Sequence, residues 1–191
     1  MQLVTPTVAT PDQLADGRTL GRNEAPVTLV VWSDFQCPSC AAFSREVQPK
    51  LVQDFVLPGQ LKIEYRDDAF IGPESVDAAV AARCAADQDR FWPYHDYLFW
   101  NQRGENSGAF DRTVLDAIGR TVGLDMEPFD ACLDSPSGPS AVTADTTAAD
   151  DAGVKVTPTL QIGATMMPGA PLTDAQYTVL KKVIERTLPG Q

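Results

Sequence analysis

The first strong pattern along the chain is a continuous apolar run at residues 25–32 (APVTLVVW), rich in β-branched side chains. Such runs are typical of a strand that is buried on both faces of a sheet. A second strand is predicted at residues 61–67 (LKIEYRD). Between the two, apolar side chains recur at helical spacing, at Cys40, Phe43, Val47, Leu51 and Phe55. The order strand, helix, strand favours a parallel pair of strands.

Two prolines fall within this helix. Pro38 suits the first turn, where the missing N–H group costs no hydrogen bond. Pro49 lies in the middle and removes one hydrogen bond of the helical ladder, so we expect a kink there.

The middle of the chain, between residues 72 and 151, shows only helical patterns. Helices are predicted at residues 73–87, 90–100, 110–123, 126–135 and 139–153. A strand returns at residues 154–163 (VKVTPTLQIG), and a short one at 165–169 is expected to pair back across the turn at Gly163. A helix at 174–188 closes the chain.

These patterns divide the chain into three parts. Residues 1–24 are expected to form a flexible polar lead-in. Residues 25–71 and 152–191 carry the strands and are predicted to form one α/β domain. Residues 72–151 are predicted to form an inserted helical domain.

The net charge of the chain limits the classes of partner that it can be expected to bind. The 191 residues carry a formal net charge of -11, which argues against nucleic acid and anionic membranes as partners. No apolar run approaches the length of a membrane span. Residues 1–17 show neither the basic start nor the apolar segment of a signal peptide. We therefore expect either a cytosolic protein or one whose export signal or anchor lies outside this numbering.

The candidate chemistry lies in the stretch SDFQCPSC, where Cys37 and Cys40 directly follow the first apolar run. A zinc site needs four ligands, and the other cysteines and the single histidine do not supply a second pair, so no metal is expected. A purely structural disulfide here would close too short a loop to stabilise the fold much. The third possibility is a redox couple.

The position of the pair favours the redox couple. Cys37 falls where the strand meets the helix, and the backbone N–H groups of a helix N-terminus stabilise a thiolate. Pro38 helps to start the helix, and Ser39 could donate a hydrogen bond toward the Cys37 sulfur. Cys40 lies one turn later on the apolar stripe. One exposed, ionised sulfur and one shielded, neutral sulfur suit thiol–disulfide exchange.

These segments resemble the DsbA-like thiol–disulfide oxidoreductases of the thioredoxin superfamily. The likeness is carried by APVTLVVWSDFQCPSCAAF, by LKIEYRDDAF and by VTPTLQIG, and it spans roughly residues 21–188. It implies a thioredoxin fold, of class α/β, with an inserted all-helical domain. By this resemblance Cys37 is the nucleophile and Cys40 the resolving cysteine. It also implies that Thr157–Pro158 is a cis peptide beside the disulfide, which leaves the Thr157 backbone free to pair with a substrate peptide.

The sequence departs from the family pattern in two places. Ser39 occupies a position where the best-studied DsbA has histidine, so we expect a less stabilised thiolate than in that enzyme. The strand before Cys37 holds no acidic residue, whereas some relatives bury one there to relay a proton to the resolving sulfur. Asp34 and Glu64 are the alternatives that this sequence offers.

The remaining cysteines, Cys84 and Cys132, lie on apolar stripes of two predicted helices in the same block. They could be two buried free thiols. Some DsbA-like proteins carry a second bridge in the helical domain, and this resemblance favours a structural disulfide between them if the compartment is oxidising.

The aromatic segment around His95 could suggest a ligand site, but a helix packed into the core is the better interpretation. Met166 and Met167 are interpreted as packing residues rather than metal ligands.

The sequence therefore predicts an enzyme that introduces disulfides into exported proteins through its Cys-Pro-Ser-Cys couple, without a cofactor. The expected partners are reduced proteins or peptides and, by resemblance, a membrane partner of the DsbB or VKOR type that reoxidises the couple. We expect an extracytoplasmic monomer. The alternatives are a reductase or isomerase of the same fold, a non-catalytic binding module and a cytosolic redox sensor.

Overall fold

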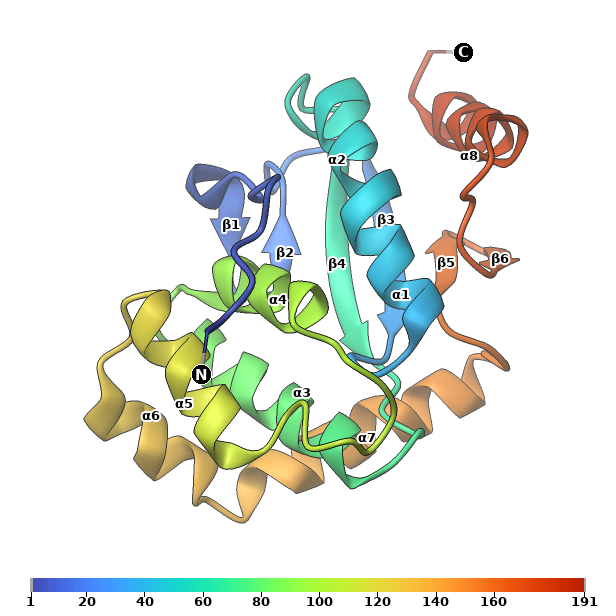
Figure 1. Cartoon of the computed structure of the whole chain (residues 1–191). Coiled ribbons are helices and arrows are strands. Elements are labelled where there is room, and N and C mark those ends of the chain that lie inside the picture. Colours follow the sequence, from blue (N-terminus) through green and yellow to red (C-terminus); the bar gives the residue numbers. More distant parts are fainter. Residues whose placement is uncertain (1, 191) are drawn as a thin grey trace.

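The structure is a computed structural model that describes residues 2–190. Within them, one mixed sheet holds its strands in the order β1–β2–β4–β3–β5–β6 (Figure 1). The neighbours β3 and β4 run parallel, and each of the other neighbouring pairs is antiparallel. The strands span Ala15–Asp16 (β1), Thr19–Leu20 (β2), Val27–Ser33 (β3), Leu61–Asp67 (β4), Thr159–Ile162 (β5) and Thr165–Pro168 (β6).

The central strand β3 lies between β4 and β5, which explains its continuous apolar sequence. Val27, Leu29 and Val31 are buried in the main core, and Trp32 packs with Ala149 and Val154 in a smaller cluster. The predicted parallel pairing with β4 is confirmed. Because the two strands are parallel, their carboxyl ends meet at one edge of the sheet, where the CxxC turn begins.

The helix that follows β3 runs from Pro38 to Val56 but is not regular. The segments α1 (Pro38–Ala42) and α2 (Gln48–Leu51) alternate with the wider π-turns η2 (Phe43–Val47) and η3 (Val52–Val56). The π-turn η2 ends at Val47, and the N–H of the next residue, Gln48, donates to the Phe43 carbonyl. Pro49 follows Gln48 as the second residue of α2. The kink expected at Pro49 stays a prediction; the structure shows a π-turn that ends two residues before Pro49, and the helix continues past it.

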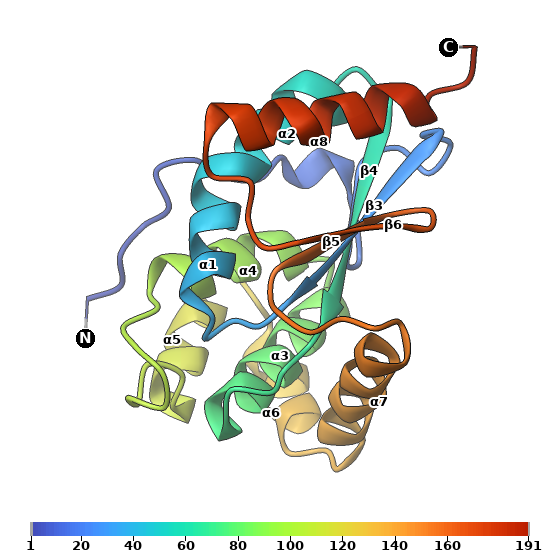
Figure 2. The same cartoon turned by 90° about the vertical axis from the view of Figure 1, so that its right-hand side faces the viewer.

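Five helices follow one another between β4 and β5. They gather at the end of the sheet where β3 and β4 finish (Figures 1 and 2). None of the helices within residues 2–190 is both long and apolar enough to span a bilayer. The division into a separate helical domain at residues 72 and 151 stays a prediction. The five are α3 (Pro73–Ala86), α4 (Phe91–Trp100), α5 (Arg112–Thr121), α6 (Met126–Leu133) and α7 (Ser137–Asp151).

The segment before residue 25 differs from the expected flexible lead-in. It contains a 3-10 turn, η1 (Asp12–Leu14), and the strands β1 and β2, and β2 pairs with β4. Leu20 is fully buried, and the indole of Trp92 donates to the Thr19 carbonyl at 3.1 Å. Such short strands have no apolar run of their own, so their pairing depends on the edge that β4 offers.

The strand predicted at residues 154–163 begins only at Thr159. The five residues before it form an irregular loop in which the Thr157–Pro158 peptide bond is cis. Proline lacks an N–H group, so a strand in this sheet starts more readily after it.

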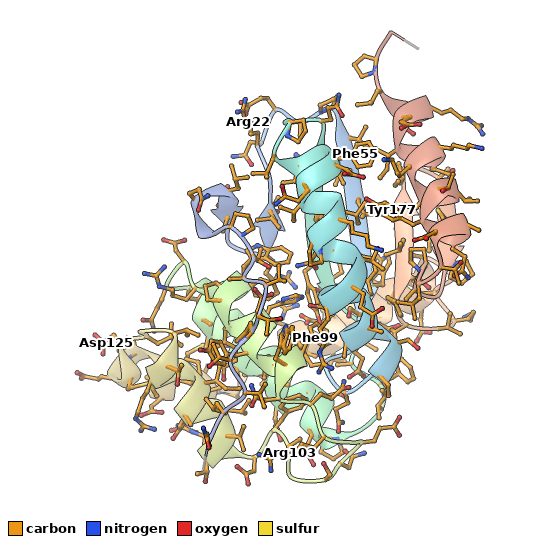
Figure 3. The ribbon with its side chains drawn as sticks, turned by 45° about the horizontal axis from the view of Figure 1, so that its top comes forward. Arg22, Phe55, Phe99, Arg103, Asp125 and Tyr177 are labelled. Carbon is orange, nitrogen blue, oxygen red and sulfur yellow. A yellow bond between two sulfur atoms is a disulfide. The ribbon has the colours of Figure 1, made fainter. Side chains whose placement is uncertain are left out.

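The closing helix α8 (Asp174–Thr187) has a capping box at its start, formed by Thr173 and Gln176. Its side chains Leu180 and Ile184 are buried in the main core. On the same face, the partly buried Tyr177 lies beside the long helix that carries Phe55 (Figure 3), and its hydroxyl donates to Asp54 at 3.0 Å.

Candidate redox site

The two cysteines of the CxxC pair occupy different positions on one helix end. Cys37 is the N-cap of α1 and has extended backbone angles, while Cys40 lies one turn inside. The N–H groups of Cys40 and Ala41 both donate to the Cys37 carbonyl at 3.1 Å. Cys37 keeps 8% of its surface exposed and Cys40 only 1%. Both are free thiols in this structure.

Hydrogen bonds from the Cys40 thiol, from Thr157 and from the helix end lower the pKa of Cys37. The hydrogen bond from the Cys40 thiol lowers the pKa of Cys37 most, and hydrogen bonds from Thr157 and from the backbone N–H groups of Cys40 and Ser39 add to this effect. Burial opposes these contributions, and the resulting pKa of Cys37 is about 6. A thiol with this pKa is mostly ionised at neutral pH.

Cys40 is shifted in the opposite direction. Burial raises its pKa well above the ordinary value, and the hydrogen bond to Cys37 and the charge of Cys37 raise it further. The Ser33 side chain and the Asp34 backbone N–H oppose this by donating to Cys40. The pair therefore combines an acidic thiol, which is nearly buried rather than exposed as the sequence predicted, with a protonated thiol buried beneath it.

The loop before β5 completes the site. The cis peptide Thr157–Pro158 brings the Thr157 carbonyl within 3.3 Å of the Cys37 sulfur, which donates to it. Among the described residues, the buried Thr157 hydroxyl has no hydrogen-bond partner in this thiol form. It nevertheless lies within reach of the Cys37 sulfur, because a hydrogen bond from the Thr157 side chain is among the causes of the lowered pKa of Cys37. The structure thus brings Cys37, Cys40, Thr157 and Pro158 together, with Pro38 and Ser39 in the same turn.

The carboxylates of the two candidate relay acids bind other groups. The Asp34 carboxylate is 1% exposed and accepts hydrogen bonds from Ser75 Oγ at 2.7 Å and from the N–H groups of Gln36, Phe70 and Ile71. Burial raises its pKa. Glu64 pairs with Arg66 on β4. In the described part of the chain, no hydrogen bond joins either carboxylate to Cys40, so Asp34 instead ties the CxxC turn to the start of α3.

Two further residues near the site, Ser33 and Asp68, were not identified from the sequence. Ser33 ends the buried strand β3 and reaches Cys40. Asp68 follows β4, is 8% exposed, and has its pKa raised to about 6, first by burial and then by the charges of Asp150 and Asp34. The sequence offered one indication of Ser33, which is a polar residue at the end of an apolar run. It offered no indication of Asp68, because the residues around Asp68 come from distant segments of the chain.

Outside the site, Cys84 in α3 and Cys132 in α6 form a disulfide with Cα atoms 5.8 Å apart. His95 is 1% exposed and lies among aromatic rings, with Nδ1 3.0 Å from Asp96 Oδ1, which agrees with a core position. Met166 and Met167 lie on β6. In residues 2–190 no group of three or more His, Cys, Asp or Glu side chains could hold a metal ion.

Comparisons with known proteins agree with this geometry. A family model described as Thioredoxin matches residues 13–185. Disulfide bond formation protein D of Bacillus subtilis (strain 168) is 30% identical over 175 residues, which are 90% of this chain and 77% of that protein. The crystal structure of oxidised BdbD from Bacillus subtilis matches with a TM-score of 0.81 at 26% identity, covering 98% of this chain and 100% of that one.

A more distant match shows the same fold. The thiol-disulfide exchange protein alpha-DsbA2 from Wolbachia pipientis gives a TM-score of 0.74 at 23% identity, and covers 92% of this chain and 90% of that one. The predicted fold class and reaction class are both confirmed. The chain belongs to the thioredoxin family and is a DsbA-type thiol–disulfide oxidoreductase.

Proposed function

We propose that this protein oxidises thiols of exported proteins, with Cys37 as the nucleophilic cysteine and Cys40 as the resolving cysteine. The observation that carries the proposal is the asymmetry of the pair. The pKa of Cys37 is lowered to about 6 while that of Cys40 is raised. A stabilised Cys37 thiolate favours the reduced form of the couple, and a couple with a favoured reduced form is an oxidant.

The reaction uses the oxidised couple. A substrate thiolate attacks the Cys37 sulfur, the Cys37–Cys40 bond breaks, and Cys40 leaves as a thiolate that takes up a proton because its pKa is high. A second substrate thiolate then attacks the substrate sulfur of the mixed disulfide, and Cys37 leaves as a stable thiolate. Two electrons pass from the two substrate thiols to the couple, and the substrate gains one disulfide.

The other site residues hold this geometry. Pro38 starts the helix, and the backbone N–H of Ser39 stabilises the Cys37 thiolate. Thr157 and Pro158 lie beside the Cys37 sulfur, and a substrate peptide would pair with the Thr157 backbone there. The disulfide between Cys84 and Cys132 stabilises the helical region and takes no part in exchange.

The proposal extends to partners and compartment. Reduced proteins or peptides are the substrates, and a membrane partner of the DsbB or VKOR type restores the disulfide. The name of the Bacillus subtilis relative, a disulfide bond formation protein, supports the oxidising direction. The bridge between Cys84 and Cys132 supports an extracytoplasmic location, because such bonds persist in oxidising compartments. We also propose a monomer that binds no nucleic acid.

The test is a turnover experiment. Oxidised protein is mixed with a reduced peptide that carries two cysteines, and peptide oxidation is followed by mass spectrometry. Wild type should oxidise the peptide stoichiometrically, Cys37→Ser should be inactive, and Cys40→Ser should form a mixed disulfide through Cys37 once the peptide is supplied as an activated disulfide. A variant with both Cys84 and Cys132 changed to alanine is the control and should remain active. Equal activity in Cys37→Ser would contradict the proposal.

A further inference from the structure

The loop between α4 and α5, residues 101–111, passes beside the amino-terminal end of α1 (Figure 1), and Figure 3 labels Arg103 on it. We infer that Asn106 and Gln102 of this loop are positioning residues, which hold the turn before Cys37 in the form that makes its sulfur reactive. The inference deepens the proposed function and rests on it.

The contact runs through Gln36, the residue directly before Cys37. Its side chain is 1% exposed, and its Nε2 atom donates to Ser75 Oγ at 2.9 Å and to Asn106 Oδ1 at 3.3 Å. Its Oε1 atom accepts the backbone N–H of Asn106 at 2.5 Å. A buried amide needs partners at both ends, and here Asn106 serves both ends.

The two residues before Gln36 are held as well. Gln102 Nε2 donates to the Phe35 carbonyl at 2.8 Å, and the Asp34 carboxylate accepts the Gln36 N–H at 2.8 Å. Three successive residues before Cys37 are therefore held by hydrogen bonds, two of them by this loop. If this backbone rotated, the Cys37 sulfur would move relative to the N–H groups that stabilise its thiolate.

The loop is itself fixed to the start of α3. Glu74 accepts the N–H groups of Gly108 at 2.8 Å and Phe110 at 2.9 Å. Asn106 has a left-handed φ of 47°, which asparagine tolerates better than most residues. Its amide fills the space where a Cβ atom at Gly72 would stand. The loop thus links the helical region to the CxxC turn, while Asn106 itself remains exposed.

The decisive variant is Asn106→Gly. Glycine adopts the left-handed φ and keeps the backbone N–H, so the change removes only the side-chain amide. We expect the pKa of Cys37 to rise, and the fraction of Cys37 thiolate at pH 5 to fall about fivefold, the factor that one hydrogen bond corresponds to. The readout is the thiolate absorbance at 240 nm against pH, together with the alkylation rate. A second variant, Gln102→Met, should act in the same direction.

Ser107→Ala is the matched control, because Ser107 Oγ donates to the Gly104 carbonyl within the same loop. It should leave the Cys37 titration unchanged. If Asn106→Gly and Gln102→Met titrate like Ser107→Ala, or only lower the unfolding midpoint, the positioning role is wrong. An ordinary thiol pKa for Cys37 in the wild-type protein would instead overturn the proposed function, so the two failures are distinguishable.

Discussion

The hydroxyl of Thr157 illustrates how single atoms set the chemistry of the site. It is buried, has no partner within the described residues while Cys37 is a thiol, and adds to the lowering of the pKa of Cys37. Thr157→Val keeps the shape and removes the donor. We expect the pKa of Cys37 to rise from about 6 toward about 7, since one hydrogen bond to a charged group is lost.

Thiolate absorbance against pH measures this change. Thr159→Val is the matched control, because the Thr159 hydroxyl donates to the Val156 carbonyl at 2.6 Å. An unchanged Cys37 titration in Thr157→Val would show that the hydroxyl does not reach the thiolate.

The acidity of Cys37 also predicts how pH affects the stability of the reduced protein. Its folded pKa of about 6 lies below the value of about 8.5 for an unfolded chain. A lowered pKa contributes stability that is present above the unfolded value and is lost as pH falls through the folded value. The reduced protein should therefore gain about 2 kcal/mol between pH 5 and pH 8 relative to the oxidised protein.

Denaturant unfolding of both redox forms at several pH values tests this prediction. Comparing the two forms removes the contributions of carboxylates, which both forms share. A stability difference that does not change between pH 5 and pH 8 would mean that the Cys37 thiolate is not stabilised by the fold.

Asp68 is expected to act in the opposite sense. The folded pKa of Asp68, about 6, is above the ordinary value for aspartate. The stability that protonated Asp68 contributes to the folded protein is therefore lost as pH rises through about 6. Asp68→Asn should stabilise the protein by roughly 1 kcal/mol at pH 7.5, because a buried charge beside Asp150 and Asp34 disappears. The gain should shrink as pH approaches 4. Denaturation midpoints at both pH values measure it, and destabilisation at pH 7.5 would contradict the account.

At the scale of elements, the disulfide joins α3 to α6 across a sequence separation of 48 residues. Changing both Cys84 and Cys132 to alanine should lower the free energy of unfolding by about 4 kcal/mol in the chain-entropy model, because a long loop is no longer closed in the unfolded chain. Chemical denaturation gives the loss. The Cys37–Cys40 couple should keep its reduction potential, and a large shift in that potential would show that the bridge also shapes the site.

Strands and helices could be predicted from the sequence where the local pattern of apolar residues alone determines the secondary structure. The strand β3 is visible as a continuous apolar run, and its parallel partner β4 and the five following helices were also predicted from the pattern of the sequence. Prediction failed where structure depends on distant partners. The strands β1 and β2 need the edge of β4, and the loop before β5 is shaped around Pro158.

The same distinction applies to the site. Cys37 and Cys40 could be identified from spacing, and Thr157 and Pro158 only from the family resemblance. Ser33 offered one signal, as a polar residue at the end of an apolar run. Asp68 and Asn106 offered none, because each acts through residues that are distant in sequence.

At the scale of the whole molecule, the site lies where the sheet meets the helical region. The turn after β3, the start of α3, the loop between α4 and α5 and the loop before β5 all converge there (Figure 2). We propose that residues 72–151 form a domain of their own, and that its contacts with this turn tune the cysteine chemistry. The central claim is that the molecule as a whole favours the reduced couple.

The most direct test of that claim is the equilibrium reduction potential of the Cys37–Cys40 couple in glutathione buffers. The pKa of Cys37, about 6, lies between the about 3.5 of DsbA and the about 7 of thioredoxin. The account therefore predicts a potential between the about -120 mV of DsbA and the about -270 mV of thioredoxin, more oxidising than that of thioredoxin. Such a value would establish electron flow from substrate thiols to this protein. A potential near about -270 mV would contradict the account and identify the protein as a reductase.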